Sequence, residues 1–167
     1  MKSEIRILTA TDAEQSVALR KRMLLDSPPA FAASPEDDSG SQLHIVKERL
    51  ASGPENIQIG AFAPDLIGSV GMFRESKLKT RHQLYIWGMY VAPDFREQGI
   101  GAALIKAAIE HGRSLDGIVQ VHLAVSEDAK AAHSLYESLG FRRWGTEPRA
   151  VCVNGEFFDE HHMVFDL

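Results

Sequence analysis

The segment from Val91 to Ala102 constrains the fold of this chain more than any other part. It reads Val-Ala-Pro-Asp-Phe-Arg-Glu-Gln-Gly-Ile-Gly-Ala, so a strand ends, a basic and glycine-rich loop follows, and a helix begins. The first N–H groups of a helix have no partner within it, and the helix macrodipole is positive there. Gly99 and Gly101 let the backbone approach an anion closely, and Arg96 adds a charged donor. The segment therefore predicts a site for a ligand that carries a diphosphate.

Two common phosphate-binding motifs do not match this loop. Gly99-Ile-Gly101 continues as Ala-Ala-Leu104, where the GxGxxG motif has a third glycine. The Lys-Ser/Thr pair that follows a P-loop glycine is missing, and no acidic residue suited to Mg²⁺ lies nearby. A nucleotide-binding enzyme is therefore a remote alternative.

A longer string around this loop matches a known family. Gly88-Met-Tyr-Val-Ala-Pro93, followed by Arg96-x-x-Gly99-x-Gly101, resembles the acyl-CoA pyrophosphate loop of the GNAT (GCN5-related) N-acetyltransferases. The resemblance covers essentially the whole chain and implies acetyl-CoA as the acyl donor, without a metal. The cofactor-binding positions that it implies are Met89, Tyr90, Val91, Arg96, Glu97, Gln98, Gly99, Ile100, Gly101, Ala102, Ser126, Lys130 and His133.

The second hallmark of the family occurs downstream. Ala132-x-x-Leu135-Tyr136-x-x-x-Gly140-Phe141 places three of these residues on one face of a helix that ends at a glycine. The resemblance implies that Tyr136 sits by the CoA sulfur and protonates the leaving thiolate. Without the glycine loop, the same tyrosine would read as a core aromatic residue.

One position departs from the family pattern. The family often has an asparagine where this chain has Ala129, and that asparagine helps to hold the pantetheine arm. Alanine cannot make the hydrogen bond, so we expect a modest loss of CoA affinity, worth roughly 1 kcal/mol. Ser126 is a candidate substitute.

The strand predicted at 83–91 bears on two parts of the site, the path of the pantetheine arm and the general base. Gly88 within it indicates a bulge or a close backbone approach. The resemblance implies that this strand splays from its neighbour and admits the pantetheine arm, and that a glutamate on it often serves as general base. This strand contains no acid. The candidates that stay open as the base are Glu75, His82, Tyr85, Asp159 and Glu160.

Hydrophobic periodicity and turn residues order the remaining elements. Early strands and two helices are followed by strand, helix, strand, helix and strands, and Asn154-Gly155 is a strong type I′ hairpin signal. We expect an α/β (α+β) chain with a mixed, mostly antiparallel sheet of six to seven strands, flanked by about four helices, in one domain spanning 1–167. Helices are expected at 13–26, 41–51, 99–115 and 129–139, and strands at 5–8, 57–62, 66–73, 83–91, 118–125, from 141, at 149–153 and at 156–165.

Composition and charge bear on the cellular compartment and on the classes of partner. Cys152 is the only cysteine, so no internal disulfide forms; we expect it to be buried, and the chain to be cytoplasmic. A net charge of −5 with scattered basic residues argues against nucleic acid, and no apolar run approaches the roughly 20 residues of a membrane span. His161 and His162 are adjacent on a strand and point to opposite faces, which argues against a metal site.

These observations converge on one function and one alternative. We expect an N-acetyltransferase that moves an acetyl group from acetyl-CoA to a primary amine by direct attack in a ternary complex. The acceptor, a small molecule or a peptide, is not identified by the sequence. The alternative is a non-catalytic acyl-CoA-binding or regulatory module on the same fold. The apolar C-terminal ribbon with Phe157 and Phe158 allows a homodimer, or it is the sheet's own core.

Overall fold

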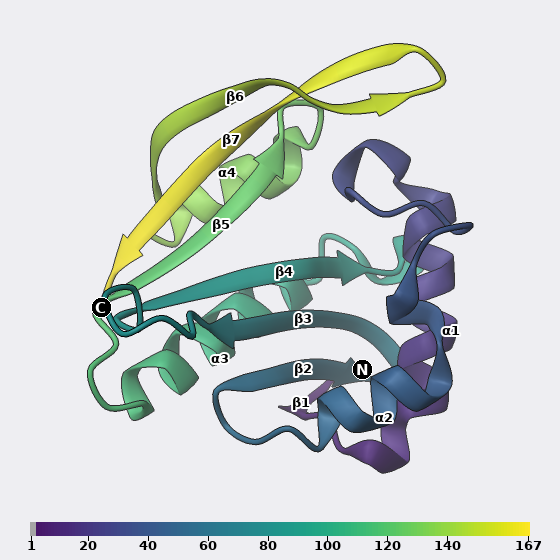
Figure 1. Cartoon of the computed structure of the whole chain (residues 1–167). Coiled ribbons are helices and arrows are strands. Elements are labelled where there is room, and N and C mark those ends of the chain that lie inside the picture. The colour runs from purple at the N-terminus through teal and green to yellow at the C-terminus, as the bar shows by residue number, and fades with distance from the viewer. Residues whose placement is uncertain (1–2) are drawn as a thin grey trace.

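The computed structural model describes residues 3–167, and within them seven strands form one sheet that four α-helices flank (Figure 1). This is the predicted fold class. The helices are α1 (Ala13–Asp26), α2 (Leu43–Leu50), α3 (Ile100–Ser114) and α4 (Lys130–Ser138). The strands are β1 (Glu4–Ile7), β2 (Asn56–Phe62), β3 (Leu66–Arg74), β4 (Gln83–Val91), β5 (Gln120–Ser126), β6 (Arg142–Val153) and β7 (Glu156–Asp166).

The sheet has the order β1-β2-β3-β4-β5-β7-β6. Among the described residues, β4 and β5 pair in parallel and the other neighbours pair antiparallel. The C-terminal ribbon does not stand apart as a two-stranded hairpin, because residues 160–166 of β7 also pair with β5. The two strands expected from 141 and at 149–153 are one strand, β6, with register shifts where bulges interrupt the pairing.

Two apolar clusters hold the layers together on opposite faces of the sheet. The larger one packs α3 and Tyr136 of α4 against the sheet, and Leu104, Ile105 and Val121 are fully buried in it. The smaller one packs α1 on the other face, where Tyr90 takes part. Leu84 and Ile86 of β4 belong to the larger cluster and Tyr90 to the smaller one, so β4 forms the floor of both layers.

A bulge in β4 breaks this alternation. Gly88 has a φ of 59°, and the register of β3 against β4 shifts between Ser69 and Gly71. The indole of Trp87 lies over Gly71, where a Cβ would come within 2.1 Å of the ring. The predicted irregularity at Gly88 is confirmed, and it turns Tyr90, which follows it, onto the α1 face of the sheet.

A buried ion pair fixes the entry to α1. Arg6 donates to both carboxylate oxygens of Asp12, at 2.8 and 2.7 Å, and Asp12 is only 6% exposed. The hydrogen bond from Arg6 lowers the pKa of Asp12 from 3.8 to about 2.

We therefore expect Asp12→Asn to lower the free energy of unfolding by about 1 kcal/mol at pH 7, a value reduced because Arg6 is partly exposed. The folded-state pKa is depressed, so the stabilisation is complete above pH 4 and disappears as the pH falls through 2. Denaturant unfolding of both proteins between pH 7 and 2 measures this difference. Asp65→Asn, in an exposed turn, is the control. A difference that does not depend on pH would contradict the assignment.

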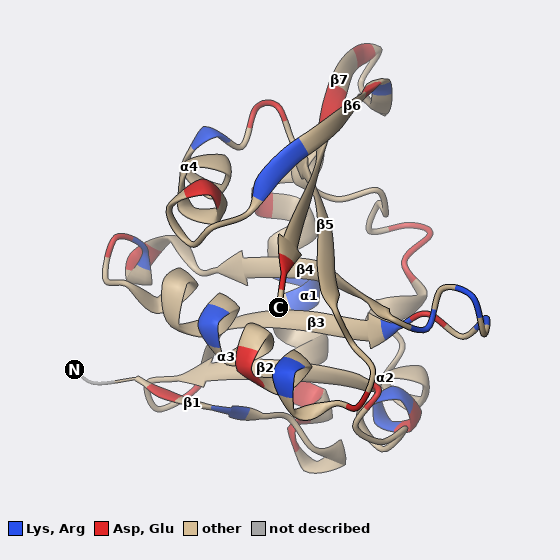
Figure 2. Ribbon diagram, turned by 90° about the vertical axis from the view of Figure 1, so that its left-hand side faces the viewer, with Lys and Arg blue, Asp and Glu red and all other residues tan. Residues whose placement is uncertain are grey.

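Charged residues of both signs are interspersed over the helices, loops and strand ends (Figure 2). Cys152 is exposed, so the expectation that it is buried was wrong: it lies on β6, a strand at the edge of the sheet, most of whose residues are exposed. No helix between residues 3 and 167 is both long and apolar enough to cross a membrane.

Candidate active site

The two central strands separate at one end of the sheet. Pairing between β4 and β5 is limited to residues 83–85 of β4 and 120–122 of β5, and beyond them the strands diverge (Figure 1). The rest of β4 therefore has an edge that pairs with no strand on the β5 side. The predicted splay is present, and it opens a gap in the middle of the sheet.

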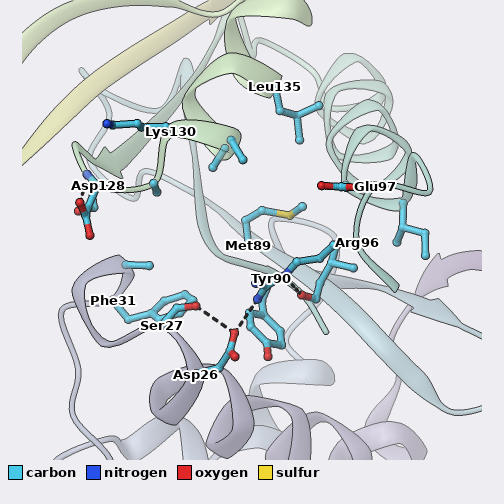
Figure 3. Close-up of a pocket in the computed structure, with 18 of the residues that line it drawn as sticks. Asp26, Ser27, Phe31, Met89, Tyr90, Arg96, Glu97, Asp128, Lys130 and Leu135 are labelled. Atoms are coloured by element: carbon cyan, nitrogen blue, oxygen red, sulfur yellow. Dashed lines mark hydrogen bonds and ion pairs between the residues drawn. The ribbon is translucent and has the colours of Figure 1, made fainter. Parts of the chain in front are cut away.

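A cavity of about 760 Å³ lies at the open end of this gap (Figure 3). Its walls come from the end of β4, the loop before α3, the N-termini of α3 and α4, and the segment after α1. The predicted cofactor positions in its lining are Met89, Tyr90, Val91, Arg96, Glu97, Gly99, Ile100, Gly101, Ala102, Ser126 and Lys130. One depression thus gathers residues that are far apart in the sequence.

The loop before α3 forms a cradle of backbone donors. Glu97 and Gly99 have positive φ values of 61° and 77°, and Gly99 is the N-cap of α3. The N–H groups of 97–102 donate to no backbone carbonyl in the part of the chain that is described. Successive free N–H groups at the positive end of a helix make an anion-binding site. The site can therefore take a diphosphate, as the sequence predicts.

Arg96 lies in the cavity wall but is already paired. Its Nη2 donates to the Asp26 carboxylate at 2.5 Å, and its Nε donates to the Val91 carbonyl at 2.9 Å (Figure 3). Burial raises the pKa of Asp26, but the hydrogen bonds from Arg96 and Ser27 and the charge of Arg96 together outweigh it and hold that pKa below its ordinary value. Arg96 therefore holds the loop against β4 and α1, and Asp26 offsets much of its charge.

A second, smaller cavity of about 70 Å³ lies within the gap itself. It shares Met89, Ser126 and Ala129 with the large cavity, so the two are contiguous. Tyr136 lines it from α4, and Trp87 from β4. Burial raises the pKa of Tyr136 well above its ordinary value, so the hydroxyl stays protonated and is suited to donate a proton.

The candidates for the general base fall in different places. Glu75 and His82 lie at the closed end of the gap, where their backbones bond to Gln83 and β5. Tyr85 is also in the paired region, stacked between Phe73 and His122. The Asp159 carboxylate accepts a hydrogen bond from the Arg149 N–H, which fixes the ribbon. None of these four candidates lines either cavity.

Glu160 is the candidate that lies next to the gap. It pairs across β7 and β5 with Ser126, which lines both cavities, and directly paired residues share a face of the sheet. The side chain is half-buried. Burial, and then the nearby Glu147, raise its pKa, whereas His162 acts in the opposite direction. A carboxylate with a raised pKa is a stronger proton acceptor than an exposed one.

Two predicted cofactor positions are not in the cavity wall. The side-chain amide of Gln98 donates to the Asp94 carbonyl. The His133 ring packs against the His161 ring, with the two ring centroids 5.4 Å apart. The sequence analysis also missed some lining residues, because they reach the site from distant elements and belong to no motif. They include Asp26 and Ser27, which lie at the end of α1.

Comparisons of this sequence with known proteins find acetyltransferases. Residues 22–141 match the model of the acetyltransferase (GNAT) family. A mycothiol acetyltransferase from Thermobispora bispora is 36% identical over 80% of this chain, which spans 44% of the length of that relative. The N-alpha-acetyltransferase RimI of Mycobacterium tuberculosis is 29% identical over 90% of this chain and 85% of its own.

Solved structures agree on the fold. A putative acetyltransferase from Salmonella typhimurium, yncA, was solved with its cofactor acetyl-CoA. It superposes with a TM-score of 0.85 over 100% of this chain and 95% of its own, at 18% sequence identity.

Proposed function

Since this chain belongs to the acetyltransferase (GNAT) family of acetyl-CoA-dependent acyltransferases, we propose that it transfers the acetyl group of acetyl-CoA to a primary amine by direct attack in a ternary complex. The observation that carries the proposal is the continuity of the two cavities. A cradle for a diphosphate leads into a gap that holds one protonated tyrosine. A ligand with a diphosphate at one end and a thioester at the other fits this order of groups.

The free edge of β4 supports the placement of the pantetheine arm. Residues 86–91 of β4 have no strand partner on the β5 side. The amides of pantetheine can pair with this edge as an added strand does. The arm would then carry the thioester into the small cavity, which Met89 lines, and we propose that the N–H of Met89 or of a neighbouring residue polarises the carbonyl.

The reaction needs the amine and the thioester side by side, a proton donor and a proton acceptor. The amine nitrogen attacks the thioester carbon, a C–N bond forms, and the C–S bond breaks. Tyr136 gives its proton to the leaving thiolate, and Glu160, through water, takes a proton from the amine. Each proton therefore has a named donor or acceptor, and no metal ion takes part in these steps.

The test is release of free thiol from acetyl-CoA in the presence of amines. We expect binding of CoA by calorimetry, and thiol release that depends on one class among amino acids, polyamines, other small amines and peptide N-termini. Binding without release on any of these acceptors would support the alternative, a non-catalytic acyl-CoA-binding module. No binding of CoA would contradict both.

We expect Glu160→Gln to lower kcat/KM for the amine about tenfold while the Kd for CoA stays the same. The raised pKa of Glu160 places the acidic limb of the pH–rate profile above the range of an ordinary glutamate, and the variant loses that limb. Glu156→Gln, exposed at the start of the same strand, is the control. Equal losses in the two variants would exclude a specific role for Glu160.

A further inference from the structure

Arg49 is a half-buried arginine without a counter-ion. Its guanidinium forms no hydrogen bond and no ion pair with any residue from 3 to 167, and its Nε is fully buried without a partner. Burial, and then the like charge of Arg20, lower its pKa, and Asp38 offsets this in part. A half-buried guanidinium whose Nε donor has no acceptor is stabilised when a partner of opposite charge binds it.

The neighbouring acid cannot serve as that partner. Both carboxylate oxygens of Asp38 accept hydrogen bonds from Arg20, each at 3.0 Å, and Ser41 donates to the same group. Arg20 and Asp38 form a neutral pair that is almost completely buried, with side chains 14% and 5% exposed. The cluster of Arg20, Asp38 and Arg49 therefore carries one uncompensated positive charge, in a chain whose net charge is −5.

This charge lies on the α1 and α2 face of the sheet, next to β4, and neither arginine itself lines either of the two cavities. The Arg49 guanidinium stacks 4.7 Å from the ring centroid of Trp87, and Trp87 lines the small cavity. Arg20 reaches the next residue of β4: its Nη1 is 3.7 Å from the place of a Cβ on Gly88. Both arginines come from the α1 and α2 face, opposite to the face from which Tyr136 enters the gap.

Glu160 lies on the β5 side of the same gap. Ala124 and Ser126 of β5 line the small cavity, and their direct partners on β7 are His162 and Glu160. Directly paired residues share a face, so Glu160 and the arginines flank the gap from the same side of the sheet. This face therefore offers a negative group near β5 and a positive group near β4.

Resting on the proposed acetyl transfer, we infer that the acceptor is a small amine that also carries a carboxylate near its nitrogen, as an amino acid does. Arg49 binds the carboxylate, and the amine points to the thioester and to Glu160. Desolvated charge-assisted hydrogen bonds to a guanidinium are strong, and a planar carboxylate matches the fork of its donors. Peptide N-termini and polyamines lack this carboxylate and leave Arg49 without a partner.

The test compares each acceptor with its own primary amide. Glycine, phenylalanine and glutamate are paired with the corresponding α-amides, and kcat/KM is measured by thiol release. The amine of the amide is the weaker base, so a larger fraction of it is unprotonated at neutral pH. Amine basicity therefore favours the amide there, and a preference for the acid needs another cause. We expect the wild-type protein to prefer at least one of the acids over its amide by about tenfold or more.

Variants of Arg49 test whether this residue causes the preference for the acid over the amide. Arg49→Met keeps the apolar contact with Trp87 and removes the charge, so we expect the acid-to-amide ratio to fall to about one while the Kd for CoA is unchanged. Arg49→Lys should keep part of the ratio. Lys47→Met, on the exposed side of α2, is the matched control and should keep all of it. Thermal midpoints show whether each variant is folded.

The outcomes separate this inference from the proposed function. A wild-type ratio near one, a preference for peptides or polyamines, or a ratio that survives in Arg49→Met would overturn the inference and leave acetyl transfer standing. Absence of turnover on every amine would instead contradict the proposed function. In that case, calorimetry with CoA present compares N-acetylphenylalanine with its amide, and no preference that depends on Arg49 would overturn the inference as well.

Discussion

Gly101→Asp is expected to weaken the binding of acetyl-CoA by about a hundredfold or more, the largest effect of any single substitution considered for this chain. Gly101 is the second residue of α3, inside the cradle of free N–H groups. An aspartate there puts a negative charge where a diphosphate would bind. It also fills the space through which the ligand approaches the backbone. Calorimetric titration with CoA measures the loss.

The same substitution should not unfold the protein. A Cβ at Gly101 would meet only the ends of two flexible side chains, Leu135 at 3.1 Å and Met89 at 3.2 Å. An acidic residue in the first turn is favourable for a helix, by about 0.3–1 kcal/mol. The thermal midpoint of the unliganded variant should therefore stay the same or rise, while CoA binding is lost.

Two further variants separate the causes. Gly101→Asn has nearly the same volume without the charge, so it should lose much less affinity than Gly101→Asp. Gly145→Asp, at a position with open space around it on β6, should bind CoA like the wild type. If Gly101→Asp bound CoA normally, the diphosphate would lie elsewhere, and the proposed orientation of the cofactor would be wrong.

The fold was predictable because local signals and long-range pairing agree in this chain. The strand at 83–91 was predicted with the bounds that the structure shows, because an apolar run ends at the loop of Pro93. The hairpin at Asn154-Gly155 was predicted from its sequence alone, and both residues have positive φ. The C-terminal ribbon was the weaker prediction. Its pairing with β5 spans more than 30 residues of sequence, and no local pattern encodes it.

The site was predictable where one continuous segment builds it. The cradle around Gly99 is such a segment, so its motif was enough to find it. Asp26 and Arg49 escaped the sequence analysis because their roles depend on packing. Asp26 has a role because α1 brings it to Arg96. Arg49 has a role because α2 places it on Trp87, where the neighbouring acid is already paired with another arginine. An uncompensated charge becomes visible only when the neighbours are known.

Tyr136→Phe is expected to lower kcat by about a hundredfold and to leave the Kd for CoA unchanged. Tyr136 lines the small cavity, and burial keeps its hydroxyl protonated across the working pH range, so the hydroxyl is suited to act as an acid and not as a base. Phenylalanine keeps the ring and its packing on Phe141, at 5.9 Å between centroids, and removes only the proton donor. Single-turnover acetyl transfer, with the acceptor saturating, measures the chemical step.

The two roles open to this tyrosine give different results. If it is a core aromatic residue, Tyr136→Phe keeps kcat and the thermal midpoint, because the apolar contacts are retained. If it protonates the leaving sulfur, kcat falls with no change in the thermal midpoint. The defect should then shrink with a thioester whose thiol is a stronger acid, such as p-nitrothiophenyl acetate, because that thiolate leaves without a proton. A defect of equal size with both donors would show that Tyr136 positions the thioester and does not act as the acid.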